Sequence, residues 1–141
     1  MTIQFQPLVT TSFENIIDCF VEAFSDYFVT MPTDPEIYRQ RWHMSGVDWD
    51  LSVGAFDREK LVGFIIHSVG DRQGFLTAHN SGTGVIPTHR GKGLVYGMYD
   101  YAFPRLIDAG IQKSRLEVIT ENIRAVRAYQ KVGFQIAKTY K

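Results

Sequence analysis

The sequence predicts an α/β or α+β layer fold with a mixed β-sheet, formed by a single domain over residues 1–141. Apolar residues near the N-terminus repeat with helical spacing, and the middle of the chain holds strand-like apolar runs. The elements are expected in the order βα(α)βββαβαβ, which indicates a layered fold. A chain of 141 residues that is 45% hydrophobic is typical of a globular domain with one buried core.

The N-terminal third is expected to contain one strand and two helices. Residues 2–9 alternate loosely and are typical of a strand. Thr11 or Ser12 is expected to cap a helix, because an apolar stripe follows at helical spacing, formed by Phe13, Ile16, Ile17, Phe20, Val21 and Phe24. A loop over 25–35 contains two prolines, and residues 35–44 are expected to form the second helix.

Three strands are expected in the middle of the chain, over 51–57, 60–69 and 75–86. The first two are joined by DREK, a hairpin turn without glycine. The third contains Gly82 and Gly84, and glycine inside a strand indicates a bulge or a close approach by another backbone or a ligand.

The C-terminal part is expected to alternate between helices and strands. Residues 91–109 have a helical pattern, and Pro104 is expected to kink or end this helix early because proline lacks an N–H. The remaining elements are expected to be a strand at 113–119, a helix at 122–132 and a final strand at 134–139.

Composition and charge argue against several classes of function. Fifteen basic residues balance fifteen acidic ones, so the chain lacks the positive surplus of proteins that mainly coat nucleic acid or an anionic membrane. The single cysteine, Cys19, cannot form an internal disulfide, and no secretory leader or membrane-length apolar run is found, so we expect a cytoplasmic protein. The four histidines lie far apart, and we expect no metal site.

The stretch VIPTHRGKGLVYG, residues 85–97, places a basic, glycine-broken turn between a strand and a helix. A Walker loop is excluded because Gly93 stands where it needs Ser or Thr, and a dinucleotide fingerprint because Tyr96 or Pro87 stands where it needs glycine. Gly91 and Gly93 allow N–H groups to face the same way at a helix start, which favours anions. The turn therefore predicts a phosphate or pyrophosphate site, although the motif alone fits a solvated basic turn equally well.

Several stretches of the C-terminal half follow one another in a distinctive order: VIPTHRGKGL at 85–94, LEV at 116–118, Asn122, Ala125, Tyr129 and GF at 133–134. In order and spacing they resemble the acetyl-CoA-binding core of the GNAT superfamily of N-acetyltransferases. This resemblance implies a mixed, mostly antiparallel sheet of about six strands flanked by helices on both faces. Thr88 stands where the family often has Gln or Arg, and Val95 where many members have a small residue.

The resemblance implies acetyl-CoA as cosubstrate and an amine as acceptor. In the family, the strand before the loop bonds the pantetheine arm, and the loop holds the pyrophosphate. Carried onto this sequence, the binding residues are Val85, Ile86, Thr88, His89, Arg90, Gly91, Lys92, Gly93, Leu94, Asn122 and Tyr129. Of these, His89, Arg90 and Lys92 are expected to add positive charge.

Acetyl transfer to an amine needs a proton donor for the departing thiolate. Tyr129 lies seven residues into its expected helix, and a tyrosine, with a reference pKa of about 10, is protonated at neutral pH. The family's usual general acid is a tyrosine at this place in A-x-x-x-Y-x-x-x-G-F, so we expect this role for Tyr129. The alternative is a core tyrosine packed under the helix.

The transfer also needs a base, because an alkyl ammonium has a pKa of about 10. Glu117 resembles the glutamate that is the base in the branch acetylating protein N-termini, and we rank it first. It would instead form a surface ion pair if Arg115, two residues earlier on the same strand face, binds it. His79 ranks second because an imidazole titrates near neutrality, and a water chain ranks third.

The oxyanion is expected to be stabilised by the backbone N–H of Ile86, a role that the resemblance implies. Acceptor specificity in the family comes from the early helices and their loop. That region holds aromatic and acidic side chains that suit an amine or a hydrophobic core equally: Tyr27, Phe28, Met31, Tyr38, Trp42, Asp26, Asp34 and Glu36.

The function that follows is acetyl transfer from acetyl-CoA to a primary amine of a small molecule, protein or peptide. The alternatives are a non-catalytic acyl-CoA-binding or regulatory module and a phosphate- or nucleotide-binding interaction domain. Seven residues follow Phe134, whereas the family usually continues through a further strand. We therefore expect that final strand to be missing and the chain to form a homodimer or to expose a sheet edge near 134–140.

Overall fold

The structure is a computed structural model that describes residues 2–26, 30–117 and 123–135. In this part of the chain, five strands form one sheet in the order β1-β2-β3-β4-β5. The strands are β1 (Ile3–Pro7), β2 (Val53–Asp57), β3 (Lys60–Arg72), β4 (Phe75–Val85) and β5 (Lys113–Arg115). Neighbouring strands from β1 to β4 are antiparallel, and β5 pairs with β4 in parallel. The predicted mixed, mostly antiparallel sheet is therefore confirmed.

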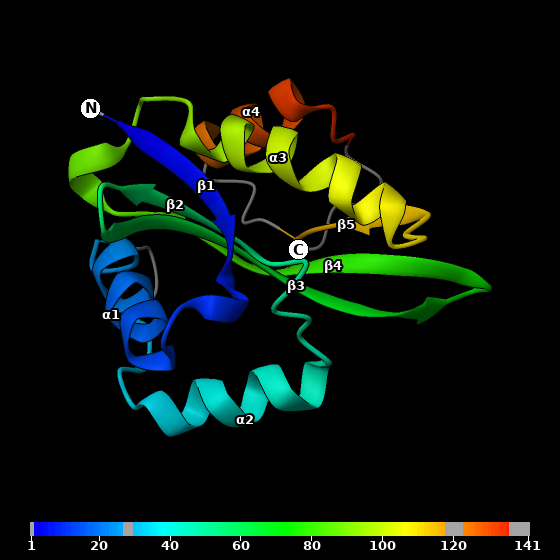
Figure 1. The fold of residues 1–141 in the computed structure, drawn as a ribbon, viewed down its shortest axis with the longest axis horizontal. Coiled ribbons are helices and arrows are strands. Elements are labelled where there is room, and N and C mark those ends of the chain that lie inside the picture. The colour runs from blue at the N-terminus through cyan, green and yellow to red at the C-terminus, as the bar shows by residue number, and fades with distance from the viewer. Residues whose placement is uncertain (1, 27–29, 118–122, 136–141) are drawn as a thin grey trace.

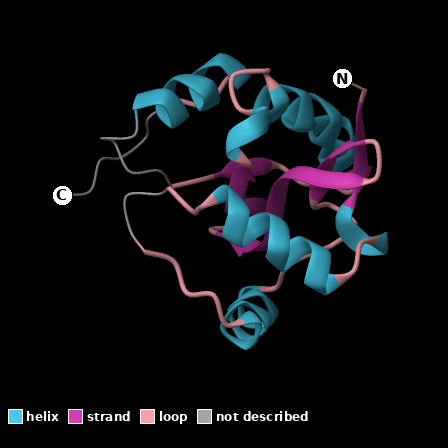
Figure 2. Cartoon of the chain, turned by 90° about the vertical axis from the view of Figure 1, so that its left-hand side faces the viewer, coloured by secondary structure: helices cyan, strands magenta, loops and turns pink. Residues whose placement is uncertain are grey.

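Helices cover both faces of this sheet, as Figure 1 shows. They are α1 (Phe13–Ala23), α2 (Pro35–Ser45), α3 (Leu94–Asp108) and α4 (Ile123–Val132). Helices α1 and α2 pack on one face, while α3 and α4 lie on the other (Figures 1 and 2). No helix in the described ranges is long and apolar enough to span a membrane.

Aromatic side chains form an apolar layer on the face of the sheet that α1 and α2 cover. Under α1 and α2, the Phe20 ring contacts Tyr38, Trp42 and Phe64 at centroid distances of 4.7, 5.5 and 5.3 Å. Helix α1 begins as predicted, because the Ser12 hydroxyl accepts the Asn15 N–H at 3.2 Å. It also buries Cys19, the only cysteine, whose side chain faces the core.

Strand β4 carries the bulge that its glycines predicted. Asn80 pairs with His67 and Gly82 with Ile66, so Ser81 is the extra residue. Gly84 has a separate reason to be glycine, since a Cβ there would lie 2.9 Å from the Cβ of Ala23 on α1. The glycines therefore allow α1 to pack closely on β4.

Some predicted boundaries differ from the structure, most clearly in the C-terminal part of the chain. Helix α3 begins at Leu94, because Gly91 and Gly93 adopt the left-handed conformation, and it continues through Pro104 to Asp108. The proline removes only one helical hydrogen bond, and buried side chains before and after it keep the helix packed. Strand β5 ends at Arg115, before the predicted 119. Residues 136–139 of the predicted final strand lie outside the described residues.

Candidate functional site

The glycine loop after β4 is built to expose backbone N–H groups. A short 3-10 helix over Pro87–His89 turns the chain, after which Gly91 and Gly93 both have φ of 74°. Other residues are strained in this left-handed conformation, so glycine is needed at both positions. The loop then leads directly into the first turn of α3.

The N–H groups of residues 91–96 have no acceptor among the residues that the structure describes. The first helical hydrogen bond runs from the Gly97 N–H to the Gly93 carbonyl at 3.0 Å. Before it, the Arg90 N–H donates to the Pro87 carbonyl at 3.5 Å, so the free donors start at Gly91 rather than at Arg90. Free N–H groups and the positive end of a helix together favour an anion.

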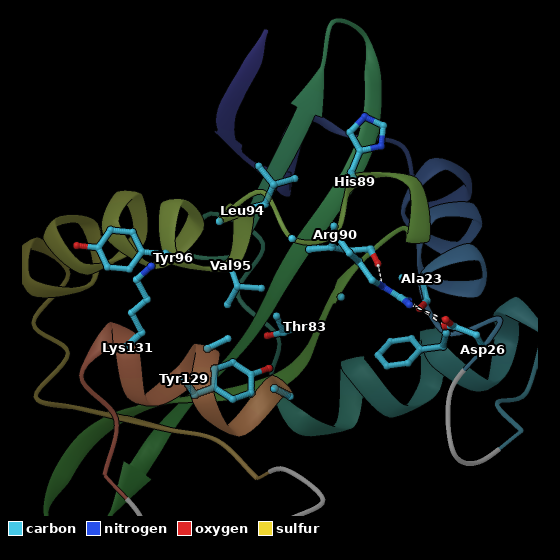
Figure 3. A pocket seen from close by; sticks show the side chains of 17 residues that line it. Ala23, Asp26, Thr83, His89, Arg90, Leu94, Val95, Tyr96, Tyr129 and Lys131 are labelled. Atoms are coloured by element: carbon cyan, nitrogen blue, oxygen red, sulfur yellow. Dashed lines mark hydrogen bonds and ion pairs between the residues drawn. The ribbon is translucent and has the colours of Figure 1, made fainter. Parts of the chain in front are cut away.

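A cleft of about 460 Å³ opens beside this loop. One side is the end of β4, with Thr83 and Val85, and the other is α4, with Ala125 and Tyr129 (Figure 3). Glycine and alanine supply much of the lining, which leaves room for a ligand backbone. The volume is in the range of small-molecule and cofactor sites.

The sheet separates where this cleft begins. Strand β5 pairs with β4 only at Thr77, Ala78 and His79, so within the described chain β4 has no partner on that side from Asn80 onward. An extended segment with an unpaired edge can bond a linear ligand. The Ile86 N–H is not part of this free edge, because it donates to the Val62 carbonyl at 2.9 Å. The expectation that Ile86 N–H stabilises an oxyanion is therefore wrong, since β3 already holds this donor.

The arrangement of strand, loop, helix and cleft matches a known family. The model of the acetyltransferase (GNAT) family matches residues 14–134. The chain belongs to the GNAT family of acetyltransferases. Members of this family take their acetyl group from acetyl-CoA, and the predicted family assignment is confirmed.

Solved structures support the same GNAT fold. A chain of the NatC complex bound to Gag peptide and CoA is 21% identical, with a TM-score of 0.78 over 98% of this chain and 87% of that one. The PaiA N-acetyltransferase from Thermoplasma acidophilum, in complex with coenzyme A, is 20% identical, with a TM-score of 0.78 over 99% and 94%. An aminoglycoside acetyltransferase from an uncultured soil metagenomic sample, in complex with sisomicin, is 14% identical, with a TM-score of 0.70 over 99% and 94%. The comparison with curated proteins finds no match.

Two basic side chains of the GNAT loop are committed to other parts of the protein. Arg90 donates from Nη1 and Nη2 to the Asp26 carboxylate at 2.6 and 2.9 Å, and from Nη2 to the Ala23 carbonyl at 2.6 Å. His89 Nε2 lies 2.8 Å from the Asp57 carboxylate, whose pKa is lowered chiefly by this hydrogen bond. Lys92 is exposed and has no ion pair with any described residue. The expected positive charge is thus partly neutralised, and Lys92 is the accessible cation of the loop.

Tyr129 reaches into the cleft from α4 toward Thr83 on β4 (Figure 3). Its half-buried ring packs edge-on against Tyr99 and Phe134, at centroid distances of 6.3 and 6.1 Å. The side chain is therefore held by the core and also lines the cleft. The packing agrees with the alternative of a core tyrosine, and the role of general acid stays a prediction.

The two candidate bases lie close to one another near the separation of β4 and β5. His79 is half-buried on β4, and its Nδ1 has no hydrogen-bond partner among described residues. Burial lowers the pKa of His79, Arg72 and Arg115 lower it further, and Glu117 acts in the opposite direction. Glu117 is exposed just beyond β5 and forms no ion pair with Arg115 within the described region.

For several candidate residues of the acceptor side, the structure supports the alternative, a structural role. Tyr38 and Trp42 are only 2% and 5% exposed and belong to the core, so they do not line an acceptor pocket. Asp34 caps α2 by accepting the Glu36 N–H at 3.0 Å, and Asp26 binds Arg90. The predicted residues Tyr27, Phe28 and Asn122 lie outside the described residues.

Sequence reasoning missed a polar cluster beside the cleft. The Asn80 side-chain amide donates to the Tyr99 hydroxyl at 2.5 Å and to the hydroxyl of Thr83, a residue of the cleft wall. Its carbonyl oxygen accepts the Gly82 N–H at 2.9 Å. The cluster connects the bulged part of β4 to α3. In the sequence, only Gly82 and Gly84 indicated that this part of the strand is irregular.

Proposed function

We propose that the protein is an acetyl-CoA-dependent N-acetyltransferase that acetylates a primary amine of a small molecule, protein or peptide. The observation that carries this proposal is the row of unpaired N–H groups over residues 91–96 at the mouth of the cleft. A diphosphate is the group that such a row suits best. Acetyl-CoA supplies the acetyl group as a thioester.

The residues present fit coenzyme A. The N–H groups of Gly91 to Tyr96 would hold the diphosphate, and Lys92 adds a positive charge there. The open edge of β4 near Val85 would bond the pantetheine amides. Tyr96 and Lys131 line the outer part of the same cleft, where an adenosine group would find a ring and a cation.

Tyr129 in the cleft, and His79 and Glu117 near the separation of β4 and β5, would supply the proton transfers. The Tyr129 hydroxyl would give its proton to the thiolate sulfur that leaves, because a phenol is protonated at neutral pH. His79 or Glu117 would take the proton from the amine, directly or through water. Burial lowers the pKa of His79 and favours the neutral imidazole, while Glu117 acts on this pKa in the opposite direction.

The first test is binding followed by turnover. Calorimetry should give tight binding of coenzyme A and weak binding of ATP, and acetyl-CoA with a panel of amines and peptides should release thiol. Binding without turnover for any acceptor would instead assign a non-catalytic acyl-CoA-binding module. Tight ATP binding with none for coenzyme A would contradict the proposal and indicate a nucleotide-binding domain.

Replacing Tyr129 by phenylalanine tests its role as general acid. We expect Tyr129→Phe to lower kcat by about 10²- to 10⁴-fold, the usual contribution of a positioned acid, while coenzyme A binds with unchanged affinity. Tyr101→Phe is the matched control, because Tyr101 lies on α3 against Phe5, away from the cleft lining. Equal activity of Tyr129→Phe and the control would leave Tyr129 with a packing role.

The same assay distinguishes the two candidate bases. If Glu117 takes the proton, Glu117→Gln should lose turnover at every pH. If His79 takes the proton, His79→Gln should lose turnover at every pH, and Glu117→Gln should only shift the acidic limb of the pH profile.

A further inference from the structure

We propose that Ser81, the bulged residue of β4, binds the acceptor amine through its hydroxyl oxygen. This inference rests on the proposed function, because it names the contact that would orient the amine. It comes from a chain of serine hydroxyls that the acetyl-transfer chemistry described above does not use.

Three serine hydroxyls connect β4 to the end of α2. Ser81 Oγ is hydrogen-bonded to Ser68 Oγ on β3, and Ser68 Oγ donates to Ser45 Oγ at 3.0 Å. Ser45, the last residue of α2, donates to the Trp42 carbonyl at 3.2 Å. Ser68 is 6% exposed, so water does not interrupt the middle of the chain.

The carbonyl at the end of the chain fixes the direction of every hydrogen bond. A carbonyl only accepts, and each serine has one hydrogen to give. Ser45 spends its hydrogen on Trp42 and must accept from Ser68, so Ser68 must in turn accept from Ser81. Ser81 is left with unused lone pairs and no free hydrogen. It is therefore set to accept a hydrogen bond, as an amine or ammonium would offer, and does not match a carboxylate.

The chain is not a proton relay. Its far end is the Trp42 carbonyl, which cannot take up a proton, so a proton delivered to Ser81 has no destination along it. The amine must lose its proton to another group. His79 is directly opposite Ser68 in the β3–β4 register, and cross-strand partners share a face, so the candidate base lies beside the same serine chain.

The position of Ser81 suits an acceptor group. β5 stops pairing with β4 at His79, and Ser81 follows two residues later. Thr83, two residues further on, lines the cleft together with the glycine loop. The Ser81 hydroxyl instead points to the α2 face, where it is bonded to Ser68. An amine approaching from the face that α1 and α2 cover would therefore meet Ser81 just beyond the last β4–β5 pair.

The test compares serine variants with one set of primary amines: phenethylamine, spermidine and a tripeptide amide with a free N-terminus. We expect Ser81→Ala to raise the KM for the preferred amine about ten-fold, as loss of one hydrogen bond predicts, with kcat changed less than KM. Ser81→Thr keeps the hydroxyl and should restore most of the affinity. Coenzyme A affinity should stay unchanged in both variants. The urea midpoint should fall modestly in Ser81→Ala, because buried Ser68 loses its donor, and should stay close to wild type in Ser81→Thr.

Ser114→Ala is the matched control, since Ser114 lies on β5 opposite Ala78 and is not part of the hydroxyl chain. An unchanged KM in Ser81→Ala, with an active wild-type enzyme, overturns the inference and leaves the proposed function intact. If the wild-type protein shows no turnover, calorimetry measures the binding of the same amines to the coenzyme A-saturated protein instead. Amine binding that Ser81→Ala abolishes would then support the site and reject the transferase, and no amine binding would reject both.

Discussion

His67 is a buried titratable side chain on β3 and faces the α3 layer. It is 0% exposed, donates from Nδ1 to the Leu51 carbonyl at 2.8 Å, and stacks edge-on with Tyr99. Its Nε2 has no partner among described residues. Burial lowers the pKa of His67 more than the Leu51 carbonyl and Asp48 raise it, and His79 also lowers it. The folded protein therefore keeps this imidazole neutral.

A neutral buried histidine makes stability depend on pH. The unfolded chain takes up a proton near pH 6.5, whereas folded His67 does so only at lower pH, so stability is full above about 6.5 and falls as the pH drops below it. We expect the urea midpoint to decrease between pH 7 and pH 5.5. In His67→Gln the decrease should be smaller, with the exposed His43→Gln as control. An identical decrease in His67→Gln would assign the pH dependence to other groups, of which His79 is the first candidate.

At the scale of single elements, β4 depends on its glycines for contact with α1. A Cβ at Gly84 would lie 2.8 Å from the Phe64 ring and 2.9 Å from the Cβ of Ala23. We expect Gly84→Ala to lower the free energy of unfolding by about 1–3 kcal/mol through overpacking, measured by urea denaturation. Gly70→Ala on β3 is the matched control, because nothing lies within 4 Å of its added Cβ. Equal effects of both substitutions would mean that strand conformation, and not packing, decides the cost.

Local patterns predicted most elements, because their signals are contained within one element. The apolar stripe and the Ser12 cap predicted α1, and Gly82 and Gly84 predicted the bulge. The expected early end at Pro104 was wrong because the cost of proline in a helix is set locally, whereas buried residues of α3 on both sides of it outweigh that cost.

The same difference between local signals and distant contacts decides which features of the candidate site could be predicted. The exposed N–H groups were predicted, since glycine positions set the loop backbone. The contacts of Arg90 and His89 were not, because Asp26 and Asp57 are 64 and 32 residues away in the sequence. Charge in a motif does not reveal which distant partner will neutralise it.

At the scale of the whole molecule, Arg90 joins three segments around the cleft. Its guanidinium donates to the Ala23 carbonyl at the end of α1 and to the Val85 carbonyl at the end of β4, at 2.6 and 3.0 Å. Together with Asp26, these bonds hold the glycine loop after β4 against α1 (Figure 3). Arg90 is therefore a positioning residue for the loop.

Removing this link should destabilise the fold and loosen the loop. We expect Arg90→Met to lower the free energy of unfolding by about 1–3 kcal/mol, because two carbonyls lose their donor, and to weaken coenzyme A binding. Asp26→Asn retains both carbonyl bonds and is exposed, so its urea midpoint should change little. A larger effect of Asp26→Asn than of Arg90→Met would contradict this assignment.

The buried position of Cys19 has a practical consequence for every assay of thiol release. Its side chain is 3% exposed, and burial raises its pKa to about 12, so the reactive thiolate is scarce in the folded protein. A chromogenic disulfide reagent will therefore count liberated coenzyme A without a background from the enzyme. Slow labelling of the protein itself, in turn, will report how often the first helix detaches from the sheet.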